Sequence, residues 1–230
     1  MTFIVLAALI FFFVFFDWNW FKHPIERLLS RDSGRIVRID GPLNVHLFAW
    51  EPTATADGLT ISNPSWAPPG NTAAIRRVTV QTSLFSLLFG RPALLRLDLD
   101  APQFDLLRDR QGRATWEFGK TAAVNALPPD LPPIRQFTIR NGHLHLADER
   151  RHMVLTGTIS SRESAAGGRA AFQLDGQGTM NTKPFFMYAE GGPLLHIDRA
   201  TPYDFDLQVA AGATRIVAKG AVTHEPRAQS

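Results

Sequence analysis

Residues Leu94–Phe118, which read LLRLDLDAPQFDLLRDRQGRATWEF, decide the fold of this chain. Hydrophobic side chains at Leu95, Leu97 and Leu99 alternate with charged ones, and Phe104 and Leu106 follow. Successive side chains of a β-strand point to opposite faces, so a period of two predicts strands with one hydrophobic and one charged face.

The same alternation recurs on both sides of this stretch. Strands are expected at residues 35–39, 43–47, 54–61, 75–82, 137–140, 143–146, 153–159, 170–179, 185–189, 203–211 and 214–222. Short connections favour antiparallel pairing of neighbours, and Asp40-Gly41, Asn141-Gly142 and Gly212-Ala213 predict hairpin turns. We therefore expect a mainly β protein, with an N-terminal transmembrane helix followed by an extended, curled antiparallel β-sheet that forms a β-groove or half-barrel. One or two short helices are expected, including one over residues 83–89.

The hydrophobic face of this sheet can be buried in two ways. It can close on itself as a sandwich or barrel, or it can form a half-open groove covered by something else, such as acyl chains. The alternation is the same in both cases. The candidate residues for the floor of a lipid-binding groove are Leu95, Leu97, Leu99, Phe104, Leu106, Phe137, Ile139, Leu144 and Leu146.

The N-terminal end of the chain has the character of a membrane anchor. Residues 1–16, MTFIVLAALIFFFVFF, carry no charged side chain, and Trp18, Trp20 and Phe21 follow where a membrane interface is expected. We predict an uncleaved anchor over residues 1–21. The alternatives are a signal peptide, which would need a basic flank and a small-residue cleavage site, and a core helix, which would need a large core around it.

Composition divides the rest of the chain into segments. A short amphipathic helix is expected over residues 22–33, where it would cap the following domain or rest on the membrane surface. A first β segment follows at 34–118, then a proline-rich linker at 119–133, a second β segment at 134–222 and a disordered tail at 223–230.

The overall composition excludes several classes of function. The 230 residues carry a formal net charge of +3 with arginines spread along the chain, so no nucleic-acid-binding surface is expected. Cysteine is absent, which excludes disulfides, zinc–thiolate sites and thiol nucleophiles.

The residue types used in catalysis and metal binding follow the strand alternation. His143 and His145 alternate with leucines and are expected on the solvent face rather than in a zinc site. Asp98 and Asp100 alternate with leucines in the same way, unlike a catalytic carboxylate pair. We expect no enzyme activity, no catalytic residue, no metal and no cofactor. Trp66 and Trp116 lie beside turns, either packed with a partner for the indole N–H or at a groove rim.

Several stretches together resemble one known family. GRIVRIDGPL (Gly34–Leu43), ADGLTISNPSW (Ala56–Trp66), Leu94–Phe118 and GGPLLHIDRATPYDFDL (Gly191–Leu207) resemble the N-terminal part of the AsmA family, as does the anchor followed by DWNWFKHPIE. The resemblance implies a single inner-membrane helix with a cytoplasmic N-terminus, a β-rich body in the bacterial periplasm and a relation to TamB-like repeating-β-groove proteins. Family members usually run on with more strands, so a monomer of this length is not expected to bridge an envelope.

The resemblance implies two functions and no catalytic residues. The first is binding or transfer of phospholipid along the apolar groove in support of outer-membrane biogenesis. The alternative is a non-lipid scaffold that assists or regulates outer-membrane protein assembly, with exposed sheet edges that pair with an envelope protein partner.

Overall fold

The computed structural model describes residues 18–46, 50–83, 94–118, 134–164, 171–193 and 203–222. These residues form a 3₁₀ turn, one α-helix and a single 11-stranded sheet. The elements are η1 (Trp18–Phe21), α2 (Lys22–Ser33), β1 (Val37–Ile39), β2 (Leu43–His46), β3 (Thr53–Ser62), β4 (Asn71–Thr82), β5 (Leu94–Arg108), β6 (Ile134–Asp148), β7 (Met153–Ser164), β8 (Ala171–Met180), β9 (Lys183–Gly191), β10 (Tyr203–Ala211) and β11 (Thr214–Val222).

The strands follow one another across the sheet in almost the order of the sequence. The path runs β1-β3-β4-β5-β6-β7-β8-β9-β10-β11, and β2 also pairs with β3. All neighbours are antiparallel except β5 and β6, which are parallel. The prediction of a mainly β fold is confirmed, and the predicted antiparallel pairing is found between all neighbouring strands except β5 and β6. The two predicted β segments meet at this parallel pair and form one sheet.

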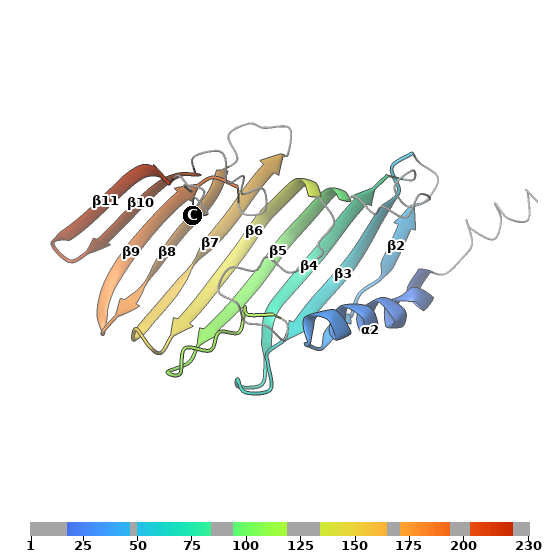
Figure 1. The fold of residues 1–230 in the computed structure, drawn as a ribbon, viewed down its shortest axis with the longest axis horizontal. Helices are drawn as coiled ribbons and strands as arrows, with labels where there is room; N and C mark the ends of the chain where they lie inside the picture. The colour runs from blue at the N-terminus through green and yellow to red at the C-terminus, as the bar shows by residue number, and fades with distance from the viewer. Residues whose placement is uncertain are drawn as a thin grey trace, which may run out of the picture.

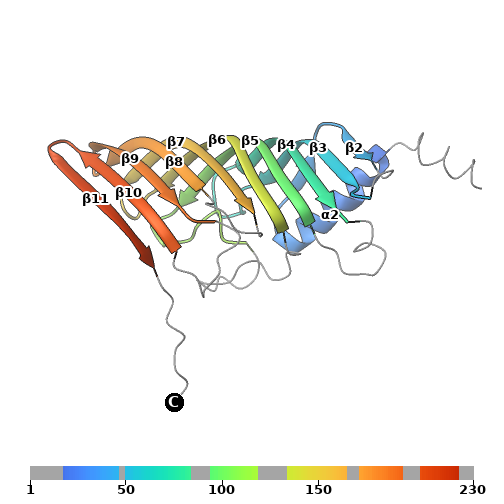
Figure 2. The ribbon, with the colours of Figure 1, turned by 90° about the horizontal axis from the view of Figure 1, so that it is seen from above.

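The sheet is long and bowed. Figure 1 shows the strands side by side across its length, with α2 beside the N-terminal end. Figure 2, turned by 90°, shows that the sheet curves rather than lying flat. Right-handed strand twist and backbone irregularities both add curvature to a sheet.

Backbone irregularities occur at matching cross-strand positions in the four adjacent strands β3, β4, β5 and β6. Gly58 in β3, Ala101 in β5 and Asn141 in β6 have positive φ angles of 69°, 48° and 53°, and Arg76 in β4 falls outside the regular cross-strand pairing. Each strand thus contains one extra residue, which exchanges the faces of odd and even positions. The hydrophobic residues are odd before the irregularity in β5 and even after it, so the extra residue keeps them on one face.

Two of the three predicted hairpins are replaced by these irregularities. Asn141-Gly142 lies inside β6, and Asp40-Gly41 joins β1 to β2 along the edge of β3, where the Asp40 N–H donates to the Gly58 carbonyl over 3.0 Å. Asn141 has a positive φ of 53°, which a bulge and a tight hairpin turn can both accommodate, so the Asn-Gly signal is common to both. The predicted turn at Gly212-Ala213 does join β10 to β11.

Glycines bring β7 and β8 unusually close together. A Cβ atom at Gly157 would overlap the Asp175 carbonyl oxygen, and one at Gly178 would overlap the Val154 carbonyl oxygen. Gly157 and Gly176 are direct cross-strand partners. Backbone replaces side chains here, which permits sharp local curvature.

The N-terminal edge of the sheet is covered by η1 and α2. The N–H of Ile39 donates to Glu26 Oε1 over 2.7 Å, that of Val37 to Ser30 Oγ over 2.9 Å and that of Leu43 to Asn19 Oδ1 over 3.0 Å. These are backbone donors of β1 and β2 that no further strand uses, and an edge strand needs such cover to avoid pairing with other chains. The helix at residues 22–33 therefore closes one edge of the sheet.

Several predicted segments lie outside the described residues. They are the greater part of the anchor (residues 1–17), most of the predicted helix at 83–89, the linker at 119–133 and the tail at 223–230. Within the described residues, no helix is both long enough and hydrophobic enough to cross a membrane. Trp20 and Phe21, predicted at the membrane interface with Trp18, are 78% and 41% exposed in η1.

Candidate functional site

The parallel pair β5–β6 brings the predicted floor residues together. Eight of the nine form four direct cross-strand pairs: Leu97 with Phe137, Leu99 with Ile139, Phe104 with Leu144, and Leu106 with Leu146. Paired residues lie on the same face of a sheet. The ninth residue, Leu95, lies beside a register irregularity and has no cross-strand partner in the β4–β5 or β5–β6 ladder.

The hydrophobic face extends well beyond these eight residues. One buried cluster contains Ile134, Phe137 and Ile139, with Leu94, Leu97, Leu99 and Ile159 packed against it. A second contains Leu155, Leu174 and Phe185, with side chains from β6 to β10 packed against it. Ile159 contacts both clusters, so the face is continuous from β5 to β10.

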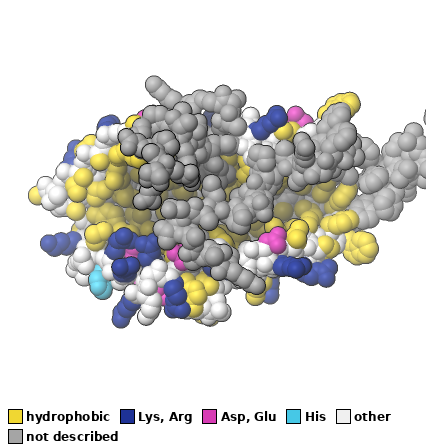
Figure 3. Space-filling model, viewed as in Figure 1, with side chains coloured by type: hydrophobic (Ala, Val, Ile, Leu, Met, Phe, Trp, Pro, Cys, Tyr) yellow, Lys and Arg dark blue, Asp and Glu magenta, His cyan; other side chains and the backbone are white. Residues whose placement is uncertain are grey.

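The space-filling view gives the distribution of side chains on this face. Figure 3 shows hydrophobic side chains over the part of this face that the described residues display, with basic and acidic side chains along its lower edge. The described strands supply a single layer of β-structure to this face. A hydrophobic interior with a charged rim suits an elongated apolar ligand that has a polar end.

The hydrophobic face also carries a buried polar pair near one end of β7. Ser161 is 3% exposed and Glu163 is 2% exposed, and the Ser161 hydroxyl donates to Glu163 Oε1 over 2.9 Å. Their cross-strand partners are Ile139 and Phe137, which places both on the hydrophobic face. Burial raises the pKa of Tyr203, and the charge of Glu163 raises it further. Ser161 and Glu163 are odd-numbered residues of β7, like the buried Leu155, so the alternation of the strand indicates that they share its face. This pair was not identified from the sequence alone.

Arginine side chains stack on the tryptophans at the rim where β5 ends. The Arg113 guanidinium lies 4.6 Å from the Trp66 ring centre, and that of Arg108 lies 5.0 Å from the Trp116 ring centre. Arg113 also donates to Asp109 Oδ2 over 2.6 Å. Stacking of this kind is favourable because the ring face is electron-rich. The two tryptophans hold the turn after β5 in place, and sequence spacing alone did not indicate their arginine partners.

At the end of β6, burial and hydrogen bonding have opposite effects on the pKa of Asp148. Asp148 is 3% exposed, and burial alone would raise its pKa. The hydrogen bonds from Arg151 and the charge of Arg108 outweigh burial, so the pKa of Asp148 is lowered. The carboxylate therefore stays ionised and ties the rim together.

Charged pairs follow the backbone irregularities of β3 to β6 on the outer face. Arg77 Nε donates to Asp57 Oδ1 over 2.7 Å, Arg76 pairs with Asp100, and Asn141 Nδ2 donates to Asp100 Oδ1 over 3.4 Å. The hydrogen bond from Arg77 lowers the pKa of Asp57, and that from Arg76 lowers the pKa of Asp100.

Asp98 and Asp100, which alternate with leucines in β5, also form ion pairs with arginines. Asp98 is 5% exposed and its Oδ2 pairs with Arg96 over 2.7 Å and Arg140 over 3.5 Å. Asp98 and Asp100 therefore form separate ion pairs on the outer face.

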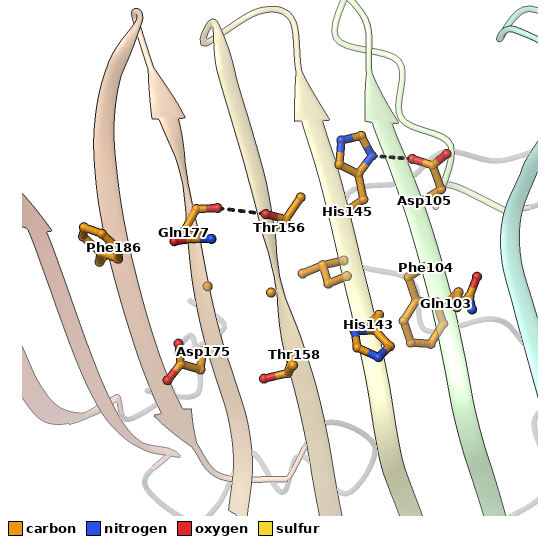
Figure 4. A pocket seen from close by; sticks show the side chains of 13 residues that line it. Gln103, Phe104, Asp105, His143, His145, Thr156, Thr158, Asp175, Gln177 and Phe186 are labelled. Atoms are coloured by element: carbon orange, nitrogen blue, oxygen red, sulfur yellow. Dashed lines mark hydrogen bonds and ion pairs between the residues drawn. The ribbon is translucent and has the colours of Figure 1, made fainter.

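A shallow depression of about 780 Å³ opens on the outer face. Figure 4 shows its polar side chains in two rows across β5 to β8, including His143, His145, Thr156 and Asp175. His145 Nδ1 lies 2.7 Å from Asp105 Oδ1, with the two side chains 47% and 66% exposed. This exposure is that of a surface ion pair and not of a buried acid–base pair.

The histidines take the positions that alternation predicted. His143 and His145 lie on the outer face, opposite Leu144 and Leu146, and within the described residues no group of His, Cys, Asp or Glu side chains is arranged to hold a metal ion.

Comparison with known proteins identifies the family of the chain. Neither the curated proteins nor the solved structures gave a significant match. The AsmA family model matches residues 1–189, which include η1, α2 and the strands from β1 to most of β9. AsmA is not known as an enzyme family, and membership points to the cell envelope and outer-membrane biogenesis. The chain belongs to the AsmA family.

Proposed function

We propose that this protein binds phospholipid along the hydrophobic face of β5 to β10 and transfers it in support of outer-membrane biogenesis. The observation that carries the proposal is the continuity of that face across six strands. Neighbouring strands lie ~4.8 Å apart, so five spacings give a hydrophobic path of roughly 24 Å. Each leaflet of a bilayer has a hydrocarbon depth of roughly 15 Å, so an acyl chain fits within this path.

The mechanism is partition of acyl chains from the membrane onto the sheet. Burial of each CH₂ group contributes ~0.8 kcal/mol, so the groove competes with the bilayer as an apolar solvent. The lipid headgroup stays at the rim, where Arg108 and Arg113 lie beside tryptophans. The anchor at residues 1–21 would hold the N-terminus in the cytoplasm and the sheet in the periplasm at the inner-membrane surface, where lipid enters.

The test compares two charged substitutions at adjacent positions of β6. Leu144 lies on the hydrophobic face and His143 on the outer face. Both Leu144→Asp and His143→Asp introduce the same carboxylate into the same strand. The full chain is purified in mild detergent, and bound phospholipid is quantified by mass spectrometry after lipid extraction.

We expect Leu144→Asp to lose most of the lipid that is bound beyond the amount held around the anchor, because a carboxylate is costly to bury against acyl chains. His143→Asp should retain the wild-type amount. Circular dichroism and thermal melting establish that both variants are folded. Equal lipid content in two folded variants contradicts the proposal. The outer-face residue Asp98 is a poorer control, since its ion pairs with Arg96 and Arg140 stabilise the sheet.

A further inference from the structure

The two edge strands of the sheet differ in whether other parts of the described chain cover them. The N-terminal edge is covered by side chains of Asn19, Glu26 and Ser30, which accept hydrogen bonds from β1 and β2. The opposite edge is β11, and in the described part of the chain its one partner strand is β10. Ile216, Val217 and Val222 of β11 are 55%, 52% and 49% exposed.

The backbone groups that β11 offers follow from its hairpin. Ala211 and Thr214 close the two-residue turn, so they form a hydrogen-bonded pair, and the even residues of β11 bond to β10. The odd residues Arg215, Val217, Lys219 and Ala221 then direct their N–H and C=O groups outward. A nine-residue strand whose outward backbone groups pair with no other strand in the described part of the chain is a template for a further strand.

We propose that β11 pairs antiparallel with β11 of a second copy of this chain, around a two-fold axis at Ala218. Full overlap of the two strands requires this register, in which Val217 faces Lys219 and Arg215 faces Ala221 of the other copy. No two like charges are directly opposite. A shift of the axis to Val217 would place Arg215 against Lys219, which is unfavourable.

The rest of the fold supports a second copy as the occupant. Lys219 is already paired with Asp206 of its own β10 over 2.6 Å, so its charge is balanced before the strands meet. Head-to-tail stacking of copies is blocked, because η1 and α2 cover the other edge. The self-pairing of β11 is therefore closed and stops at two copies.

A two-fold axis perpendicular to the sheet keeps the hydrophobic faces of both copies on the same side. The dimer would then have one continuous groove of twice the length. The pairing itself does not depend on lipid binding, whereas the value of a longer groove rests on the proposed function.

The test uses the absence of cysteine from the chain. In the proposed register, Ala218 faces Ala218 of the other copy as a non-hydrogen-bonded pair with Cα atoms ~4.5 Å apart, within the range that a disulfide bridges. The full chain carrying Ala218→Cys is oxidised in membranes and run on a non-reducing gel. We expect most of it to migrate as a disulfide-linked dimer.

Two controls define the register. Thr214→Cys alone should give little dimer, since the two copies of residue 214 would lie eight residues apart, or roughly 27 Å. A mixture of Thr214→Cys and Val222→Cys chains should form a mixed disulfide. Absence of the Ala218 dimer, or equal dimer from Thr214→Cys alone, overturns the proposal.

A second variant tests the pairing without a cross-link. Val217→Pro removes an outward N–H from the edge and leaves the bonds to β10 intact, and proline is tolerated at such positions. In detergent, the wild-type protein should have a mass of two chains of 25.5 kDa, and the variant, with an unchanged circular dichroism spectrum, a mass of one. A wild-type monomer contradicts the proposal, and a lipid-binding result of either sign leaves this outcome unaffected.

Discussion

At the scale of single residues, the close approach of β7 and β8 depends on glycine. A Cβ at Gly157 would overlap backbone atoms of Asp175 and Gly176, which have no freedom to turn away. We predict that Gly157→Ala lowers the free energy of unfolding by roughly 1–3 kcal/mol, as overpacking does. Urea denaturation measures this change.

Gly220→Ala is the matched control for this prediction. Its Cβ would make ordinary contact with the Phe205 ring at 3.4 Å, and Gly220 also lies inside a strand. The free energy of unfolding should change by less than about 0.5 kcal/mol. Equal destabilisation by the two substitutions would show that strand propensity and not close packing governs Gly157.

Ala101 has an unfavourable backbone conformation for its residue type. Its φ of 48° is in the left-handed region, which costs an alanine roughly 1–2 kcal/mol relative to the right-handed region. Ala101→Gly should therefore raise the thermal midpoint, because glycine adopts this conformation without the Cβ clash. Ala74→Gly, in regular β4 conformation, should lower the midpoint. A fall in both variants would argue against the extra residue in β5.

The alternation of residues predicted which side chains share the hydrophobic face, but not why these side chains change from odd to even positions along β5. Leu97 and Leu99 are followed by Phe104 and Leu106, and this change of parity is itself the signal for an extra residue in the strand. Ser161 and Glu163 could have been placed on the hydrophobic face from the parity of β7. The arginine partners of Trp66 and Trp116 come from different turns and had no local signal.

At the scale of elements, the cover of the N-terminal edge depends on a carboxylate. The Ile39 N–H hydrogen bond is the main cause that lowers the pKa of Glu26. Glu26→Ala should lower the free energy of unfolding by about 1 kcal/mol near pH 7 and accelerate hydrogen exchange of the Ile39 amide. Hydrogen exchange followed by mass spectrometry of the β1 peptide gives both the site and the size of the effect.

The contribution of Glu26 to the stability of the folded protein depends on pH. A carboxylate whose pKa is lower in the folded state stabilises the protein above its unfolded pKa of about 4.3, and that stability is lost as the pH falls through the folded pKa. The wild-type protein should thus approach Glu26→Ala in stability below pH 4. A stability difference that stays constant down to pH 3 would mean that ionisation of Glu26 has no part in the cover.

Elements with strong periodicity were predictable, and their connections were not. The helix and the strands lie close to where composition and alternation placed them. Asn141-Gly142 predicts a turn but lies inside β6, because a bulge and a hairpin turn can both accommodate the positive φ of Asn141. The parallel pairing of β5 with β6 depends on the path of the chain between them, which carries no strand periodicity.

At the scale of the whole molecule, ion pairs on the outer face and rim determine how the stability of the protein changes as the pH falls. The pKa values of Asp57, Asp100, Asp109 and Asp148 are all lowered in the folded protein. The unfolded chain therefore takes up protons first as the pH falls, which favours unfolding. The urea midpoint should be nearly constant between about pH 5 and 7 and fall steadily below pH 4. A midpoint that rises on acidification would contradict these assignments.

A single bowed sheet with a hydrophobic face was within reach of the sequence, and the distinction between a groove and a closed sandwich was not. Alternation is a local property, whereas closure depends on strand order and curvature. The observed order leaves β1 and β11 at opposite edges of one sheet.

The most direct test of the central claim is photocross-linking of lipid to the sheet in cells. Benzoylphenylalanine is introduced at position 144 or 143 of the full chain, cells are grown with ³²P-phosphate, and the purified protein is examined for covalently bound phospholipid after irradiation. A groove that holds lipid predicts a labelled band from position 144, on the hydrophobic face, and little label from position 143, on the outer face. Equal labelling at the two positions, or none at position 144 in a folded protein, would contradict a lipid-binding groove.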